Sequence, residues 1–137
     1  PHDPLDAETR ARLRSPRTHH VGYATDVERY YAAMDLLVLP SHREGFPNVV
    51  LEAASMALPV VVTRVPGAAE AVIDGASGAL VDVGDVDALH AAIERYVADA
   101  DLRQSHGARG RAHVLERFDR RAVWSALAAF YEEVLAR

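Results

Sequence analysis

Short apolar runs alternate with amphipathic segments along most of this chain, a pattern typical of α/β proteins with a parallel sheet. Runs rich in Val and Leu at residues 36–40, 60–63 and 79–83 predict buried strands. A run at residues 19–23 predicts one more short strand that ends at a turn. We therefore expect a Rossmann-like parallel sheet with helices on both faces.

Apolar side chains recur at helical spacing between these runs. Helices are expected at residues 5–14, 26–34, 48–56 and 69–73, and Thr25 is the expected N-terminal cap of the second.

The last third of the chain is expected to be helical throughout. Three helices should begin at aspartates that cap their N-termini, namely Asp85, then Asp99 or Asp101, then Asp119. The first two of these helices each start with a D-x-D sequence, which is a metal-binding signature in some enzymes. Capping is the better interpretation, and we predict no metal site. The apolar stripe on the last helix, which includes Trp124 and Tyr131, is interpreted as core.

The stretch at residues 41–52, Ser-His-Arg-Glu-Gly-Phe-Pro-Asn-Val-Val-Leu-Glu, connects a predicted strand to an apolar helix. In open parallel sheets, ligands bind at loops beyond the carboxyl ends of the strands. Pro47 suits the first turn of the helix, where a missing N–H costs nothing. The amides of Asn48, Val49 and Val50 would then point unpaired at the loop and form an anion site.

Two carboxylates flank this anion site. Glu44 lies in the loop, and Glu52 lies in the helix roughly 7.5 Å along the axis from Pro47. Because carboxylates repel phosphate, each is better placed to accept hydrogen bonds from hydroxyl groups on either side of it. A diphosphate with a polyol at each end is a nucleotide sugar. The alternatives are a solvated loop acid for Glu44 and an ion pair with a neighbouring Arg for Glu52.

Three further residues at strand ends are candidates for ligand contact. Arg43 and Arg64 lie in loops where they can hold phosphate, although exposed Arg is also common in such loops. Gly67 permits either a close approach of the backbone to the ligand or simply a tight turn.

The composition narrows the class of protein. At 137 residues, with 50% hydrophobic and 26% charged residues, the chain fits one soluble globular domain. A net charge of −5 argues against nucleic acid as a non-specific partner. The chain contains no Cys, which fits a reducing compartment such as the cytoplasm, and no run of 18 apolar residues that would span a membrane.

An ordered series of residues carries a family resemblance. It comprises Glu44-Gly45-Phe46-Pro47, Glu52, Ala-Leu-Pro-Val-Val-Val-Thr at 57–63, Val65-Pro66-Gly67, Glu70, Asp74-Gly75 and Gly78. This series resembles the donor-binding, C-terminal half of a retaining glycosyltransferase with the GT-B fold, of the GT4 family, from about residue 19 to residue 118.

The resemblance implies roles for residues of this chain. It places Glu44, with the amides after it, on the donor sugar, as the residue with a catalytic part. It places Glu52 on the ribose, while Gly45, Phe46 and Pro47 shape the pocket. The nucleotide sugar is a substrate, and no cofactor is expected.

Two departures from the family pattern affect these expectations. Ala57 stands where the family usually ends the helix with Gly, and a left-handed Ala would cost about 1 kcal/mol, so we expect a reshaped turn. The family's Arg and Lys that clamp the diphosphate precede the matching region, and this chain has no Lys. We therefore expect residues 1–137 to form a partial donor domain that is inactive alone.

The predicted function is donor binding in a retaining glycosyltransferase, possible donors including UDP-sugars. The residue sequences at 44–53 and 65–67 are similar to those of enzymes that build bacterial surface polysaccharides at the inner face of the membrane. An N-terminal acceptor domain would supply the acceptor site. The resemblance also implies that the last helix returns to that domain, so we expect part of its apolar stripe to be exposed in this chain. The alternatives are half of a nucleotide-sugar epimerase or phosphorylase, or a non-catalytic interaction module. Because the resemblance implies that the family's first strands are absent, the apolar edge at residues 36–40 should either pair with residues 19–23 or recruit a second copy, and we favour the second copy.

Overall fold

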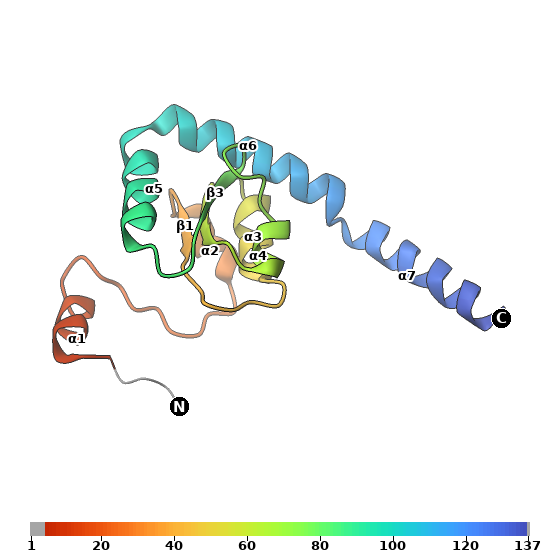
Figure 1. Ribbon diagram of the computed structural model, residues 1–137, viewed down its shortest axis with the longest axis horizontal. Coiled ribbons are helices and arrows are strands. Elements are labelled where there is room, and N and C mark those ends of the chain that lie inside the picture. Colours follow the sequence, from red (N-terminus) through yellow and green to blue (C-terminus); the bar gives the residue numbers. More distant parts are fainter. Residues whose placement is uncertain (1–4, 137) are drawn as a thin grey trace.

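A parallel three-stranded sheet forms the centre of the protein, for which a computed structural model describes residues 5–136 (Figure 1). The elements follow in the order α1 (Ala7–Leu13), α2 (Val27–Ala32), β1 (Leu37–Leu39), α3 (Asn48–Ser55), β2 (Val60–Thr63), α4 (Pro66–Glu70), β3 (Gly78–Val81), α5 (Val86–Ala98), α6 (Ala100–Arg117) and α7 (Arg120–Leu135). The strands lie in the order β1-β2-β3, and both pairs are parallel. The expected α/β class is confirmed.

Helices cover both faces of this sheet. Val62 of β2 belongs to a buried cluster with Val50 of α3 and Ala68 of α4. Val61, the neighbouring residue on the strand, belongs to a second cluster with Tyr96 of α5. Successive side chains of a strand point to opposite faces, so the all-apolar sequence of β2 follows from its burial on both sides. Figure 1 shows α5 on one side of the sheet and α3 with α4 on the other.

The strand predicted at residues 19–23 is wrong, because this segment has no regular structure. Gly22 takes φ 72°, and Tyr23 is 94% exposed. Within the described residues, the outer edge of β1 has no ladder partner. Without ladder hydrogen bonds, an extended segment leaves its backbone groups to water. The cap predicted at Thr25 is also wrong, since Asp26 occupies the N-cap position of α2.

The turn after α3 keeps its left-handed residue, so the expectation of a reshaped turn is wrong. Ala57 takes φ 59°. The amide of Ala57 donates to the Ala54 carbonyl at 2.9 Å, and the amide of Leu58 donates to the Ala53 carbonyl at 3.0 Å. These two bonds form a Schellman motif, which requires a left-handed residue at this position. Packing against α6 holds the turn from outside, because a Cβ on Gly107 would lie 1.9 Å from the Ala57 carbonyl oxygen.

The predicted aspartate caps are confirmed at the start of α5, α6 and α7. Asp85 accepts from the Ala88 amide at 2.8 Å, and Asp119 accepts from the Arg121 amide at 2.6 Å. Of the two candidates for α6, Asp99 is the cap. The D-x-D sequences therefore begin helices, as expected.

The interpretation of the α7 stripe as core is wrong, but the expectation that part of the stripe is exposed in this chain is confirmed. No described residue of α7 is buried, and Trp124 is 62% exposed. Figure 1 shows α7 extending away from the body that the other described elements form. None of the helices within residues 5–136 is long and apolar enough to cross a membrane.

Candidate functional site

The loop between β1 and α3 lies where the strands end, and neighbouring elements hold it in place. At its start, the hydroxyl of Thr63 donates to the Ser41 carbonyl. At its end, Pro47 is buried. Between these points, the Gly45 carbonyl lies against Gly67, where a Cβ would be 1.3 Å from the carbonyl oxygen. The close approach that Gly67 permits is therefore to the protein's own loop, and its contact with a ligand stays a prediction.

The N-terminus of α3 opens toward this loop. Pro47 is the N-cap residue, one position before the helix rather than in its first turn as expected, and no side chain caps this end. The amide of Val50 donates to the Pro47 carbonyl at 3.0 Å, so the expectation of a third unpaired amide is wrong. The amides of Asn48 and Val49 precede it, in the first turn, where no intrahelical partner exists. This end of α3 keeps the properties of an anion site.

Glu52 lies on an exposed face of α3 and has a tyrosine as its partner. The Tyr31 hydroxyl donates to Glu52 Oε2 at 2.7 Å. Burial of Tyr31, together with its hydrogen bond to the carboxylate, raises the pKa of Tyr31 to about 12, so it stays a donor at neutral pH. Among residues 5–136, the Arg partner that we considered for Glu52 is not found. Sequence reasoning did not connect Tyr31 with Glu52, which lies 21 residues further along the chain.

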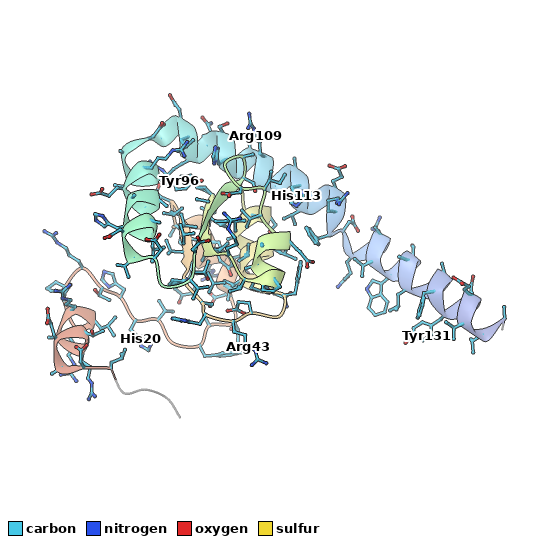
Figure 2. The ribbon with its side chains drawn as sticks, in the orientation of Figure 1. His20, Arg43, Tyr96, Arg109, His113 and Tyr131 are labelled. Carbon is cyan, nitrogen blue, oxygen red and sulfur yellow. The ribbon has the colours of Figure 1, made fainter. Side chains whose placement is uncertain are left out.

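Glu44 lies half-buried in the loop that precedes α3. Its neighbour Arg43 is exposed, and Figure 2 shows the Arg43 side chain at the outer side of the molecule. These placements leave the loop accessible from outside. The roles predicted for Glu44 and Arg43 stay predictions.

Arg64, the other candidate for phosphate, already pairs with two carboxylates. Its Nη2 lies 2.9 Å from Asp74 Oδ2, and its Nε lies 3.4 Å from Asp82 Oδ1. A hydrogen bond from the Leu80 amide lowers the pKa of Asp74, and Arg64 lowers it further. A phosphate role for Arg64 would require it to leave or share these pairs.

An aromatic contact joins the loop to the end of α6. The ring of Phe46 lies 5.4 Å from the ring of Phe118, centroid to centroid, and His113 packs edge-on against Phe118 at 5.6 Å. Figure 2 shows His113 on α6. Phe118 is the C-cap residue of α6. Sequence reasoning did not identify Phe118, because nothing near it in the chain points to the loop.

Two clefts lie near the loop, and neither is lined by Glu44 or Glu52. One, of about 130 Å³, lies at the carboxyl ends of the strands and includes His42, Thr63 and Asp82 in its lining. The other, of about 230 Å³, is apolar and lies around Tyr31 and Leu37. Glu44 and Glu52 therefore lie outside both of these clefts.

Comparison with known proteins identifies relatives of this chain. Residues 2–99 match the family described as glycosyl transferases group 1. The capsular polysaccharide biosynthesis glycosyltransferase CapM of Staphylococcus aureus is 34% identical over 122 residues, which cover 89% of this chain and 32% of CapM. The lipopolysaccharide core biosynthesis glycosyltransferase LpsE of Rhizobium meliloti is 37% identical over 112 residues, which cover 82% of this chain and 33% of LpsE.

Solved structures show the same fold. Sucrose-phosphate synthase from Thermosynechococcus elongatus matches with a TM-score of 0.87 and 29% identity, over 94% of this chain and 34% of that one. HepE from Anabaena, in complex with UDP-glucose, matches with a TM-score of 0.84 and 28% identity, over 91% of this chain and 34% of HepE. This chain thus spans about a third of the length of the proteins it matches.

Proposed function

This chain belongs to the group 1 glycosyltransferases, and we propose that it is the donor-binding half of a retaining enzyme that transfers a sugar from a nucleoside diphosphate to an acceptor. The observation that carries the proposal is the uncapped N-terminus of α3 between Glu44 and Glu52. The complexes of HepE with UDP and UDP-glucose support a UDP-sugar as the donor. The names of CapM and LpsE support an acceptor in surface polysaccharide synthesis.

The diphosphate would bind at the N-terminus of α3. The amides of Asn48 and Val49 would donate to its oxygens, aided by the positive end of the helix dipole. Arg43 is an exposed residue of the same loop, and it would add positive charge. As the bond to the sugar breaks, negative charge grows on the leaving diphosphate. Hydrogen-bonding N–H groups that are already oriented toward the diphosphate stabilise this charge without reorganisation.

Glu52 would accept hydrogen bonds from the ribose hydroxyls. Tyr31 donates to one of its two carboxylate oxygens. This bond fixes the direction of the side chain and leaves the other oxygen for the ligand. A carboxylate held in this way loses less side-chain entropy on binding than one that is free to rotate.

Glu44 would accept hydrogen bonds from the hydroxyls of the donor sugar and is the proposed catalytic residue of this chain. It precedes Gly45, Phe46 and Pro47 in the loop, whereas Glu52 lies in the helix that follows them. Positioning of the sugar is the contribution expected from it. We propose no metal and no organic cofactor.

The rest of the parent protein would supply an acceptor domain. The exposed stripe on α7 is the surface we assign to contact with it, because a continuous apolar face of this kind is usually covered. We place the parent enzyme in the cytoplasm, at the inner face of the membrane. Residues 1–137 are then a partial donor domain that binds weakly and is inactive alone.

Self-association of the isolated chain is part of this proposal. Within the described residues, β1 pairs only with β2, so its other edge offers unpaired backbone groups. A second copy would cover this edge. Light scattering over a concentration series should show mass above 14.9 kDa, and a stable monomer at high concentration would contradict the idea.

A titration followed by amide NMR tests the donor site. UDP, GDP and ADP are added in turn to the labelled chain. We expect at least one of them to shift the amide signals of Asn48 and Val49 ahead of those elsewhere. If none of the three moves these signals at millimolar concentration, donor binding is wrong and a non-catalytic interaction module becomes the better interpretation.

A further inference from the structure

The loop that carries Glu44 is held mainly at its two ends. Residues 40–47 contain no helix or strand. Thr63 holds the Ser41 carbonyl at the start, and Pro47 is buried at the end. Gly45 lies against Gly67, but neither glycine has a side chain that could restrain the other. The position of Glu44 therefore depends on what restrains the second half of the loop.

Phe46 is the side chain best placed to provide this restraint, and Phe118 is its aromatic partner. Phe46 is 40% exposed, so part of its ring is covered and part is free. The tilted contact with Phe118, with centroids 5.4 Å apart and the planes at 46°, lies within the range of favourable aromatic pairs. His113 supports Phe118 at an interplanar angle of 80°. The loop is thus attached to the end of α6 through two rings.

The end of α6 is in turn fixed relative to α3. Gly107 lies directly against the Ala57 carbonyl, and a Cβ on Gly110 would contact the Cβ of Ala54 at 3.6 Å. The Phe118 amide donates to the Val114 carbonyl at 2.9 Å and so continues the helix to its last residue. The same helix that packs along α3 therefore also holds Phe46.

We propose that Phe118 is a positioning residue of the donor site. Through Phe46 it fixes the Glu44–Pro47 part of the loop relative to the first turn of α3, so that Glu44 and the helix amides face one ligand together. This inference rests on the proposed donor-binding function. It assigns the sugar side of the site a residue from the far end of the domain.

The first test needs no ligand. Phe118→Leu keeps an apolar side chain but removes the ring, and Phe130→Leu makes the same change at an exposed position on α7. Backbone order parameters from NMR relaxation are measured for both variants. Phe118→Leu should lower the values at Glu44 and Gly45 from about 0.85 toward those of flexible loops, below about 0.6. Phe130→Leu should leave them unchanged. Unchanged values in Phe118→Leu would overturn the proposal.

The second test separates positioning from general stability. Affinities for UDP-glucose and for UDP are measured by NMR titration. Phe118→Leu should weaken UDP-glucose binding about threefold to tenfold, the size expected for one aromatic pair, and UDP binding less than about twofold. Phe118→Tyr, which keeps the ring, should restore UDP-glucose affinity, and Glu44→Gln is a positive control for selective loss of the sugar ligand.

Equal losses for both ligands would make Phe118 merely structural and overturn the proposal. A wild-type chain that binds neither ligand would instead overturn the donor function, and the order parameters would still decide whether Phe118 anchors the loop. The two failures are therefore distinguishable.

Discussion

α3 and α7 both carry apolar stripes at helical spacing, yet they lie in opposite environments. Val50, Ala53 and Ala54 of α3 are buried. No described residue of α7 is buried, although Trp124 is far larger than any of these. α3 lies between β2 and α6. Figure 1 shows α7 extending away from the body that the other described elements form. Periodicity identifies the apolar face of a helix, but burial requires an element opposite that face.

The same difference in packing separates the candidate donor site on α3 from the exposed face of α7. The candidate donor site is built on α3, whose backbone is held by the sheet on one side and by the glycines of α6 on the other. Its geometry is therefore fixed by packing. No described residue of α7 is buried, and its apolar face is exposed. Substitutions in the two regions should accordingly have very different effects.

The largest effect is expected where α6 touches the turn after α3. Gly107→Ala would place a Cβ 1.9 Å from the Ala57 carbonyl oxygen, so we expect the free energy of unfolding to fall by about 3 kcal/mol. Gly110→Ala is the matched control on the same helix. Its Cβ would have ordinary contacts at 3.6 Å, so stability should stay unchanged or rise by up to about 1 kcal/mol. Urea unfolding followed by circular dichroism measures both, and equal effects would contradict the close packing.

The next effect concerns the acid on the exposed face of α3. Glu52→Ala should weaken UDP binding by about 1–3 kcal/mol, since a charge-assisted hydrogen bond to the ribose is lost. Tyr31→Phe should weaken it less, because the carboxylate remains but is no longer oriented. Calorimetry or NMR titration gives both affinities. UDP lacking the ribose hydroxyls should bind equally poorly to the wild type and to Glu52→Ala, and an unchanged UDP affinity in Glu52→Ala would exclude the ribose role.

Substitution by Gly should act in opposite directions in the two regions. Ala57→Gly relieves a left-handed residue at φ 59° and should raise the free energy of unfolding by about 1 kcal/mol. Ala126→Gly, within exposed α7, should instead reduce the helicity of that segment. In a helix interior, Gly is less favourable than Ala by about 1 kcal/mol. Thermal unfolding by circular dichroism distinguishes them. A destabilised Ala57→Gly would show that the left-handed turn carries no strain.

The packed region should also respond to pH through a buried histidine. His106 Nδ1 lies 2.9 Å from the Tyr96 hydroxyl, and both residues are buried between α5 and α6. Burial lowers the pKa of His106 from 6.5, and Arg95 and Arg109 lower it further. The folded state therefore binds fewer protons than the unfolded state below about pH 6.5. The contribution of neutral His106 to the free energy of unfolding should be fully present above this pH. It should fall as the pH drops toward the lowered pKa of His106.

Urea unfolding at about pH 7.5 and 5.5 measures this slope on either side of the ordinary histidine pKa. The double variant Tyr96→Phe/His106→Leu removes both partners, so no buried polar group is left unpaired, and it should show a smaller loss. His90→Gln, at an exposed position of α5, should keep the wild-type slope. An undiminished slope in the double variant would assign the pH dependence to other groups.

The smallest effect is expected on α7. Trp124 is 62% exposed, and Trp124→Ser should change the free energy of unfolding of the 137-residue chain by less than about 0.5 kcal/mol. Chemical unfolding measured by far-ultraviolet circular dichroism avoids dependence on the lost fluorophore. A loss above about 1 kcal/mol would show that this stripe is already packed in the isolated chain.

Elements with strong local signals were predicted well. The strand at residues 60–63 was predicted with its observed bounds, because an unbroken β-branched run has no good alternative. The caps at Asp85 and Asp119 were predicted because capping involves only residues next in sequence. The strand at residues 19–23 failed, since a strand exists only where a neighbour accepts its hydrogen bonds.

In the candidate site, too, features formed by neighbouring residues were predicted, and contacts between distant residues were missed. The order of residues from Glu44 to Glu52 placed two acids around one helix end, because a loop and the helix after it are continuous in sequence. Tyr31 was missed as the partner of Glu52, which follows it by 21 residues. Phe118 was missed because it comes from a helix that returns across the domain after β3.

The sequence by itself determined the α/β order, the caps and the residues at the N-terminus of α3, since each depends on the conformational preferences of neighbouring residues. Only the tertiary structure decided that Tyr31 holds Glu52, that Phe118 holds Phe46, and that Ala57 keeps a left-handed turn against Gly107. These contacts join residues that are far apart in the chain. Their geometry is set by how the helices cross the sheet, which no local pattern specifies.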